Sequence, residues 1–325
     1  MAKTSKSLDS IDKNLLYQLD IKSDASYQEL ANKIKTPKET VAFRIKRLLA
    51  KGFIKNFRTT VHISRFGYYY YKFFFKFQKT MQHKEEEIIA YLKNNKSIAY
   101  LAGLEGRYDV TFLVIARNLE DLQQFLNPFK SKFGEYILEQ EILTLTQVNR
   151  FNFRFFYEGG KIQRDTYPED LQQTNIDDID HFIIKRLAQN SRENLSAIAR
   201  QVKTHVNVIR YRIEKQKKSG ILGTPVLDID FSKFGVEHYQ VDISLKSQAF
   251  VEPIIQYAMT IPESTFASVL LGKYDLVLEF AVANNSRMRE IVNSIRNKFP
   301  DGVISSDTFV LHEEVVNWFP EKSPR

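Results

Sequence analysis

Residues 36–54 read TPKETVAFRIKRLLAKGFI, and residues 204–222 read THVNVIRYRIEKQKKSGIL. In the first stretch Thr36 can cap a helix, Pro37 suits the first helical position, and Gly52 is a typical stop signal. Between them, apolar residues recur at the three- or four-residue spacing of a buried helix face, at Val41, Ile45 and Leu48. The stretch therefore predicts an amphipathic helix that ends near residue 51.

The second stretch belongs to a repeat of the first. A shift of 168 residues aligns the two halves without a gap for about 60 positions. Farther along, Gly106-Arg-Tyr-Asp109 meets Gly272-Lys-Tyr-Asp275 at an offset of 166, so the duplication covers nearly the whole chain. Between the copies, residues 158–174 are polar and contain Gly and Pro, which is typical of a linker.

Each copy begins with the pattern of three short helices. Asp9 can cap the first helix, and Ser26 with Glu29 has the spacing of a capping box for the second. The third helix is the one described above, and the segment FIKNFRTTVHI that follows it is rich in strand-forming residues, as a wing would be. This order predicts a winged helix-turn-helix, whose last helix lies in the major groove of DNA.

The distribution of charge supports that prediction. The net charge of the chain is only +8. Residues 1–62 hold 13 basic and 6 acidic residues, and residues 175–228 hold 10 and 6, so these two segments carry +11 and the rest of the chain carries −3. Basic charge concentrated on two predicted DNA-binding domains indicates a polyanionic partner, double-stranded DNA.

Aromatic residues dominate the strand predicted next, YYYYKFFFKF at residues 68–77. Tyr69, Tyr71, Phe73, Phe75 and Phe77 share one face, which we expect to pack on helices. The opposite face is polar in the second copy, where Val236, His238, Gln240, Asp242 and Ser244 stand. This polar face favours an interface between two sheets over a ligand site.

The remaining elements of each copy alternate in the order β-α-β-β-α-β, which predicts a ferredoxin-like sandwich. The fold class is therefore α+β, with two winged helix-turn-helix domains alternating with two ferredoxin-like domains. The expected boundaries are 1–62, 63–157, a linker at 158–174, 175–228 and 229–325.

Composition excludes several other classes of protein. The 325 residues include no cysteine, so a disulfide framework and thiolate metal sites are excluded, and a reducing compartment is indicated. No apolar run is long enough for a membrane span, and the first ten residues lack the core of a signal peptide. We expect a soluble cytoplasmic protein without a membrane partner.

The candidate DNA-contacting residues are the outward and basic positions near the start of each third helix. They are Lys38, Glu39, Ala42, Phe43, Arg44, Lys46 and Arg47 in the first copy, and His205, Val206, Asn207, Arg210, Tyr211, Arg212 and Lys215 in the second. The two sets differ in sequence, which predicts two half-sites of different sequence about one duplex turn of 34 Å apart. Neutralising Arg44 with Lys46, or Arg210 with Arg212, is expected to flatten the salt dependence of binding.

The third-helix pattern TVAFRIKRLLAKGFI, followed by the sheet turn Gly-Arg-Tyr-Asp, resembles the Lrp/AsnC (feast/famine) family of transcriptional regulators. The second copy departs from the pattern at Gln216 and Lys217, where the first has Leu48 and Leu49. The resemblance implies a regulator that dimerises through its effector domains and responds to a small effector, often an amino acid. One chain would then be a covalently joined dimer, with further homo-oligomers left open.

Carried over by position, the resemblance places the effector near the turn between the second and third strands of each sheet. The implied residues are Gly103, Gly106, Tyr108 and Asp109 in the first copy, and Gly272, Tyr274 and Asp275 in the second. A tight turn is by itself a sufficient reason for glycine and aspartate at these positions.

Two alternatives stand beside this interpretation. Some fused tandem relatives are similar to siroheme decarboxylases, tetrapyrrole enzymes that use histidines, but none of the six histidines here recurs at the equivalent position of the other copy. The sequence thus predicts no enzyme, and it indicates no catalytic residue, cofactor or metal site. The other alternative is an architectural protein that coats DNA without selecting one operator, since charge supplies affinity and base contacts supply specificity.

Overall fold

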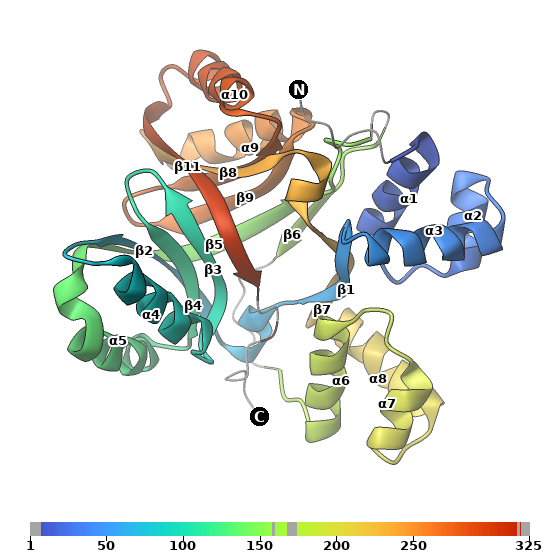
Figure 1. The fold of residues 1–325 in the computed structure, drawn as a ribbon. Helices are drawn as coiled ribbons and strands as arrows, with labels where there is room; N and C mark the ends of the chain where they lie inside the picture. The colour runs from blue at the N-terminus through green and yellow to red at the C-terminus, as the bar shows by residue number, and fades with distance from the viewer. Residues whose placement is uncertain (1–7, 158–159, 168–173, 317–318, 320–325) are drawn as a thin grey trace.

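The computed structural model describes residues 8–157, 160–167, 174–316 and 319. The first repeat begins with three helices, α1 (Ser10–Ile21), α2 (Tyr27–Ile34) and α3 (Lys38–Ala50), and the second begins with α6 (Asp178–Gln189), α7 (Leu195–Gln201) and α8 (Val206–Lys218). In Figure 1 the two helical groups lie side by side and apart from the large sheet. No helix among the described residues is long and apolar enough to cross a membrane.

The first helices begin as the sequence predicts. The side chain of Asp9 accepts a hydrogen bond from Asp12 N at the start of α1, and Ser26 with Glu29 forms the capping box of α2. The predicted cap of α3 is wrong: its N-cap residue is Pro37, and the hydroxyl of Thr36 donates to the carbonyl of Ile34 at 3.2 Å instead. The α3 start therefore has no side-chain cap, because the Thr36 hydroxyl is used by the preceding turn.

The strand after each third helix pairs across the repeats. Strand β1 (Ile54–Val61) runs antiparallel to its equivalent β7 (Leu222–Ile229), with Phe57 opposite Leu227. The expected wing is thus one half of a two-stranded ribbon shared by both copies (Figure 1). A single strand leaves its backbone groups unpaired, and its equivalent in the other repeat supplies the missing partners.

Eight further strands close into a barrel. The first repeat contributes β2 (Tyr69–Phe77), β3 (Ile98–Glu105), β4 (Val110–Ala116) and β5 (Ile137–Phe151), and the second contributes β8 (Glu237–Leu245), β9 (Ser264–Leu271), β10 (Leu276–Val282) and β11 (Val303–Val316). The strand order is β2-β4-β3-β11-β8-β10-β9-β5, and β5 returns to β2. The edge strands of each four-stranded sheet, β3 with β11 and β5 with β9, therefore pair with the sister sheet.

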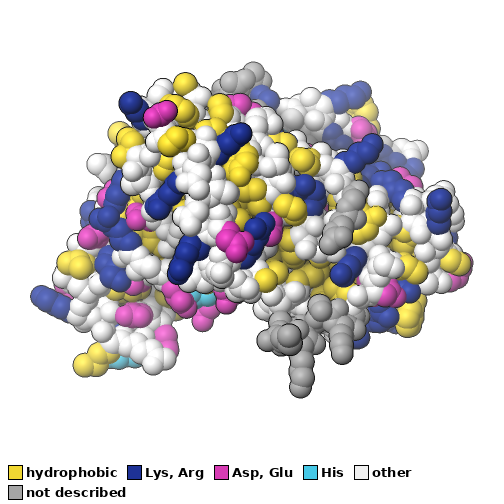
Figure 2. Space-filling view, turned by 90° about the horizontal axis from the view of Figure 1, so that it is seen from above, with side chains coloured by type: hydrophobic (Ala, Val, Ile, Leu, Met, Phe, Trp, Pro, Cys, Tyr) yellow, Lys and Arg dark blue, Asp and Glu magenta, His cyan; other side chains and the backbone are white. Residues whose placement is uncertain are grey.

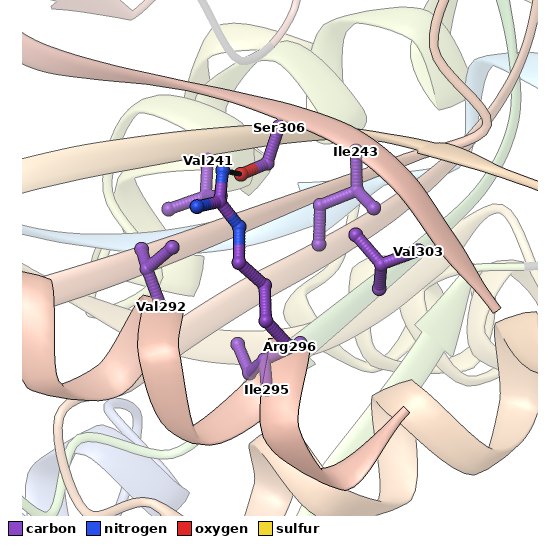
Figure 3. Close-up of a pocket in the computed structure, with 7 residues that line it drawn as sticks. All are labelled: Val241, Ile243, Val292, Ile295, Arg296, Val303 and Ser306. Atoms are coloured by element: carbon purple, nitrogen blue, oxygen red, sulfur yellow. Dashed lines mark hydrogen bonds between the residues drawn. The ribbon is translucent and has the colours of Figure 1, made fainter. Parts of the chain in front are cut away.

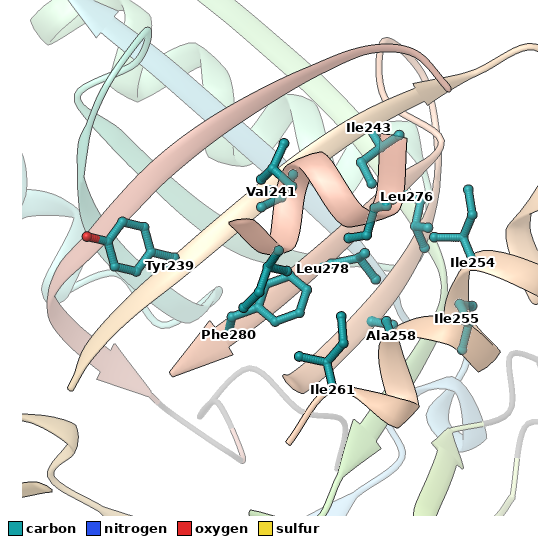
Figure 4. Packing of buried hydrophobic residues seen from close by; sticks show 14 of the residues in the cluster. Tyr239, Val241, Ile243, Ile254, Ile255, Ala258, Ile261, Leu276, Leu278 and Phe280 are labelled. Carbon is teal, nitrogen blue, oxygen red and sulfur yellow. The ribbon is translucent and has the colours of Figure 1, made fainter. Parts of the chain in front are cut away.

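Two helices cover the outside of each sheet, as the β-α-β-β-α-β order predicts. Helices α4 (Gln82–Lys93) and α5 (Leu119–Phe133) pack on the first, and α9 (Val251–Thr260) and α10 (Asn285–Lys298) on the second. Phe73 and Phe75 point to the helices, which confirms the face assigned to residues 68–77. Figure 4 shows the equivalent core of the second repeat, where Ile254 and Leu278 pack between sheet and helix.

The segment expected as a linker is partly a strand. Residues 164–167 form β6 (Arg164–Tyr167), which pairs with the far end of β5. Arg164 also forms an ion pair with Glu252 of α9, at 2.5 Å between Nη1 and Oε1. The polar composition of the segment suggested irregular structure, but the end of the long strand β5 extends beyond β2 and leaves that edge free for β6, while β9 pairs with the other edge. Residues 158–159 and 168–173 of this segment lie outside the described residues.

Candidate nucleic-acid interface

Helix α3 buries the stripe that its sequence predicts. Val41, Ile45 and Leu48 face the helical core, so the opposite side of the helix faces solvent. The exposed positions among the predicted contact residues are Lys38, Glu39, Phe43 and Lys46, while Ala42 is half-buried. These side chains form the outward face of α3, and its first turn is available to a groove of DNA.

Helix α8 has the same orientation in the second repeat. Ile209, Ile213 and Gln216 are buried. Of the predicted contact residues, His205, Asn207, Arg210, Tyr211 and Lys215 are exposed, and Val206 is half-buried. The chain thus presents two equivalent outward helix faces, one from each repeat.

Three predicted contact residues instead hold α3 and α8 in place. Arg44 forms ion pairs with Asp9 at 2.7 Å and Asp12 at 2.8 Å, and Arg47 pairs with the same buried Asp12. In the second repeat Arg212 pairs with Asp177 at 2.7 Å and Asp180 at 2.9 Å. These arginines join each third helix to the start of the first helix of its domain. One guanidinium nitrogen of each arginine is therefore engaged within the protein.

The two helical domains are joined directly as well as through the β1–β7 ribbon. The hydroxyls of Ser23 and Ser191, equivalent residues of the two repeats, share a hydrogen bond of 2.8 Å. Arg192 reaches from the second domain to the first and donates to the carbonyl of Ser23 at 2.7 Å and to that of Ala25. In the ribbon itself, Arg58 pairs with Asp228 at 2.8 Å. These contacts hold α3 and α8 in one fixed arrangement.

One further contact ties the first helical domain to the barrel. Asp20 of α1 is fully buried and forms an ion pair with Arg150 of β5, and it also accepts a hydrogen bond from Phe153 N at 2.6 Å. The equivalent positions in the second repeat are the apolar residues Ala188 and Val316. Only the first helical domain has this particular link, so the two domains are attached to the barrel differently.

Sequence alone missed these contacts, although a signal for some was present. Asp12, Ser23 and Arg44 recur as Asp180, Ser191 and Arg212 at the repeat offset. Recurrence marks such positions as required by the fold, but only the tertiary structure shows what each one touches.

The predicted effector residues lie at the barrel turns, where the structure already uses their polar groups. Asp109 accepts hydrogen bonds from Lys76 Nζ at 2.7 Å and Phe77 N at 2.6 Å. Asp275, its equivalent, accepts from Leu245 N at 2.7 Å and Gln248 Nε2 at 2.9 Å. Both aspartates thus stabilise the turn between neighbouring strands.

The glycines of this set also have local reasons. Gly106 and Gly272 adopt φ values of 149° and 143°, a conformation that other residues rarely adopt. Gly103 lies opposite His312 of the sister sheet, and a Cβ atom there would lie 2.1 Å from the histidine ring. The ring of His312 therefore lies directly over residue 103, where glycine leaves room for it.

Tyr108 and Tyr274 turn into the barrel, where both rings are buried. Tyr274 donates to Asp307 at 2.5 Å, and the hydroxyl of Tyr108 accepts from Lys273 Nζ at 2.8 Å. The neighbouring interior is filled by apolar side chains, Phe74 and Phe309 among them. The barrel turns are therefore closed by packed tyrosines.

The polar strand face predicted in the second repeat lies in this interior, where it meets the sister sheet. Lys72 of β2 donates to Gln240 of β8 at 2.8 Å, and Gln240 donates to Asp242 at 2.7 Å. Burial raises the pKa of Asp242 to about 7, and the nearby charges of Asp307 and Glu279 act in the same direction. The face is an interface between sheets, as the sequence favours.

His238 lies on the same face, between two carboxylates. Its Nδ1 lies 2.8 Å from Glu314 and its Nε2 lies 3.3 Å from Glu279. Burial alone would lower the pKa of His238, but the charges and hydrogen bonds of Glu314 and Glu279 raise it to about 10. The histidine is thus a charged partner of two acids across the barrel. Within the described residues, no group of three or more His, Cys, Asp or Glu side chains could hold a metal ion.

A narrow crevice lies outside the barrel, between α10, β8 and β11 (Figure 3). Val241, Ile243 and Val292 line it, and Arg296 Nη2 closes one side by donating to Ser306 Oγ at 2.8 Å. None of the effector residues implied by the resemblance lines this crevice.

The surface seen from above Figure 1 carries mixed charge. Figure 2 shows Lys and Arg side chains spread over this surface, with acidic side chains between them.

Comparison with known proteins agrees with this geometry. A family model described as winged helix-turn-helix DNA-binding matches residues 8–55. An uncharacterised HTH-type transcriptional regulator of Pyrococcus furiosus is 27% identical over 146 residues, which are 45% of this chain and 97% of the relative. The chain is similar over part of its length to HTH-type transcriptional regulators. Almost the full length of that relative thus matches less than half of this chain.

Two solved structures extend the comparison. The siroheme decarboxylase NirDL superposes with a TM-score of 0.64 at 11% identity, covering 94% of this chain and 92% of that one. The likeness shows that NirDL has a similar fold over nearly the whole length of this chain. Escherichia coli AsnC covers 43% of this chain and 94% of its own length, at 20% identity and a TM-score of 0.39.

Proposed function

We propose that this chain is a sequence-specific DNA-binding transcriptional regulator of the Lrp/AsnC type that acts in the cytoplasm. Residues 1–62 and 175–228 form its DNA-binding domains, and residues 63–157 and 229–325 its effector domains. Helices α3 and α8 read the two half-sites of one operator. The observation that carries the proposal is the pair of exposed, equivalent helix faces held in one arrangement by β1, β7 and the Ser23–Ser191 contact.

The positive side chains left free on these faces supply affinity for phosphate. Lys38 and Lys46 on α3 and Arg210 and Lys215 on α8 are exposed. Their contacts to the backbone would be sensitive to salt and independent of base sequence. Specificity must then come from the remaining outward side chains, which differ between the two helices.

Selection of bound duplexes from a random pool tests the proposal. We expect an enriched site with two unlike half-sites, bound at least about a thousandfold more tightly than random duplex at the same salt concentration. One chain should occupy one complete site. Equal affinity for selected and random DNA would instead identify an architectural DNA-binding protein.

The second part of the proposal is a small effector that binds the effector domains. The carboxylates of Asp109 and Asp275 already have hydrogen-bond partners within the fold, so the fold itself accounts for these two aspartates. A small effector acts only if it binds two arrangements of the paired domains unequally. Selection repeated in the presence of each amino acid tests this part. A change in affinity for the selected site supports an effector, and unchanged affinity with every amino acid contradicts an amino-acid effector.

A tetrapyrrole enzyme is the second candidate, and the whole-chain likeness to NirDL favours it. Against it stand the barrel interior, filled by Phe74, Tyr108 and Phe309, and the engagement of His238 by two glutamates. Titration with an iron tetrapyrrole distinguishes the candidates. A saturable absorbance shift would support the enzyme, and its absence would leave the regulator.

A further inference from the structure

Two aromatic rings stand out from the recognition helices. Phe43 of α3 is 64% exposed and Tyr211 of α8 is 71% exposed. They are equivalent residues, since they lie 168 positions apart and each is the sixth residue of its helix. Single exposed apolar residues are common on protein surfaces, so exposure alone carries no conclusion. The recurrence of an exposed ring at one position of both helices needs a reason.

The neighbouring positions give the comparison. At four neighbouring positions the two helices have exchanged one chemical type for another: Lys38 for Val206, Glu39 for Asn207, Ala42 for Arg210, and Lys46 for Glu214. The position of Arg47 and Lys215 keeps a basic side chain. Only the position of Phe43 and Tyr211 keeps an aromatic side chain. The divergence shows that this face tolerates changes in charge and size, so the retained ring has a use of its own.

The interior of the protein supplies no such use. The buried stripes of both helices lie on the opposite side, at Val41 and Ile45 in α3 and at Ile209 and Ile213 in α8. Among the described residues, neither Phe43 nor Tyr211 contributes to a hydrophobic core. The rings are therefore available to a partner that approaches the outward face.

We propose that Phe43 and Tyr211 each contact the 5-methyl group of a thymine in the major groove, one in each half-site. The inference rests on the proposed DNA-binding function and adds to it the base that each ring reads. The thymine methyl is an apolar group that only this base presents in the major groove, and an apolar side chain is its natural contact.

Charges beside the rings fit this placement. Lys46 lies one turn after Phe43, and Lys215 lies one turn after Tyr211, and both are exposed. If these ammonium groups contact the phosphates, Phe43 and Tyr211, which lie nearer the start of each helix, face the base edges. The hydroxyl of Tyr211 lies at the edge of the ring, so the face of the ring can make the same methyl contact as Phe43.

Uracil substitution provides the test, because replacing thymine by uracil removes only the methyl group. The full chain is titrated with its selected duplex and with duplexes carrying uracil at each thymine position in turn. We expect about a fourfold loss at one position in each half-site, the effect of one buried methyl group. Phe43→Ala should remove this loss in one half-site only, and Tyr211→Ala in the other.

Two variants serve as controls. Tyr211→Phe keeps the ring and should keep the response to uracil. Lys46→Ala should weaken binding and reduce its dependence on salt, yet leave the loss on uracil substitution unchanged. Thermal unfolding of each variant confirms that it folds, which is expected because the altered side chains are exposed.

The outcomes separate the inference from the proposed function. If the chain binds its selected site but thymine and uracil are equivalent at every position, the methyl contact is overturned and the regulator stands. The contact is also overturned if the response to uracil survives in both alanine variants. If no duplex is preferred to random DNA, the proposed function itself fails.

Discussion

The ion pairs of Arg44 and Arg212 show that basic residues on one helix can have different roles. Arg44 is directed toward Asp9 and the buried Asp12, while Lys46, two residues away, is exposed. From sequence the two basic residues look alike. The difference arises in the tertiary structure: Arg44 faces α1 and forms internal ion pairs, whereas Lys46 points away from α1 and is available to phosphate.

This difference leads to a prediction for two variants. Arg44→Ala should lower the free energy of unfolding by about 1–3 kcal/mol, because it removes charged hydrogen bonds from Asp12 while Arg47 still pairs with that carboxylate. Its salt dependence of DNA binding should match that of the wild type. Lys46→Ala should instead keep the stability and reduce the slope of log affinity against log salt by about one. Equal slopes for the two variants would contradict the assignment.

Asp242 carries a second prediction at this scale. Its pKa is about 7 in the folded protein against an ordinary value of 3.8, so the folded state holds this proton more tightly than the unfolded chain does. The stability therefore falls as the pH rises from about 4 to 7, by up to about 1.4 kcal/mol for each unit of difference between the two pKa values. Among the described residues, none donates a hydrogen bond to its Oδ2 atom.

Asp242→Asn should remove that dependence and be more stable than the wild type at pH 8. Urea unfolding between pH 4 and 8 measures both effects. Asp301→Asn, a change at an exposed aspartate, is the matched control and should follow the wild-type curve. A pH profile of Asp242→Asn that coincides with the wild type would show that this carboxyl group does not titrate in the barrel.

At the scale of elements, α8 differs from α3 at one buried position. Gln216 occupies the buried position that Leu48 fills in α3, and its Oε1 atom has no hydrogen-bond partner among the described residues. A buried amide oxygen without a partner costs free energy. The departure from the first copy at this position thus leaves an unpaired polar atom in the core of the second helical domain.

Gln216→Leu should therefore stabilise the second helical domain by about 1–3 kcal/mol, the cost of one unsatisfied buried polar group. Hydrogen exchange of the α6–α8 amides, or thermal unfolding, measures the gain. Lys217→Leu restores the other leucine of the first copy at an exposed position, and it should change stability by less than about 0.5 kcal/mol. Stabilisation of similar size in both variants would show that general apolarity, and not the buried amide, is responsible.

At the scale of the whole molecule, the two helix-turn-helix domains form one body. The β1–β7 ribbon, the Ser23–Ser191 contact and the reach of Arg192 all cross between repeats. The barrel is closed by the same principle, since β3 pairs with β11 and β5 with β9. A single chain thus completes the pairings that two separate copies would otherwise have to supply to each other.

The fixed arrangement predicts that half-site spacing cannot change. Insertion of 5 base pairs between the half-sites turns the second by about half a helical turn, and insertion of 10 restores its direction but moves it by about 34 Å. Both should lower affinity about a hundredfold or more, toward that of one half-site, because simultaneous contact is lost. Recovery of affinity with the insertion of 10 base pairs would show that the two domains move independently.

Local spacing in the sequence determined much of this protein. The apolar residues of α3, the caps at Asp9 and Ser26, the two faces of β2 and the duplication could all be inferred, because each depends on residues within a few positions or on recurrence at a fixed offset. The outward faces of α3 and α8 followed directly from their buried stripes. The same periodicity predicts that Phe43 and Tyr211 face solvent.

Only the tertiary structure decided how the two copies meet. The pairing of β1 with β7, the closure of the barrel and the strand β6 within the expected linker depend on free strand edges separated by many residues. The sequence did not predict the internal ion pairs of Arg44 and Arg212 for the same reason: their carboxylate partners lie more than thirty residues away. Local periodicity specifies which face of an element is apolar, whereas the partner of a strand edge or a charged side chain is set by the packing of distant elements.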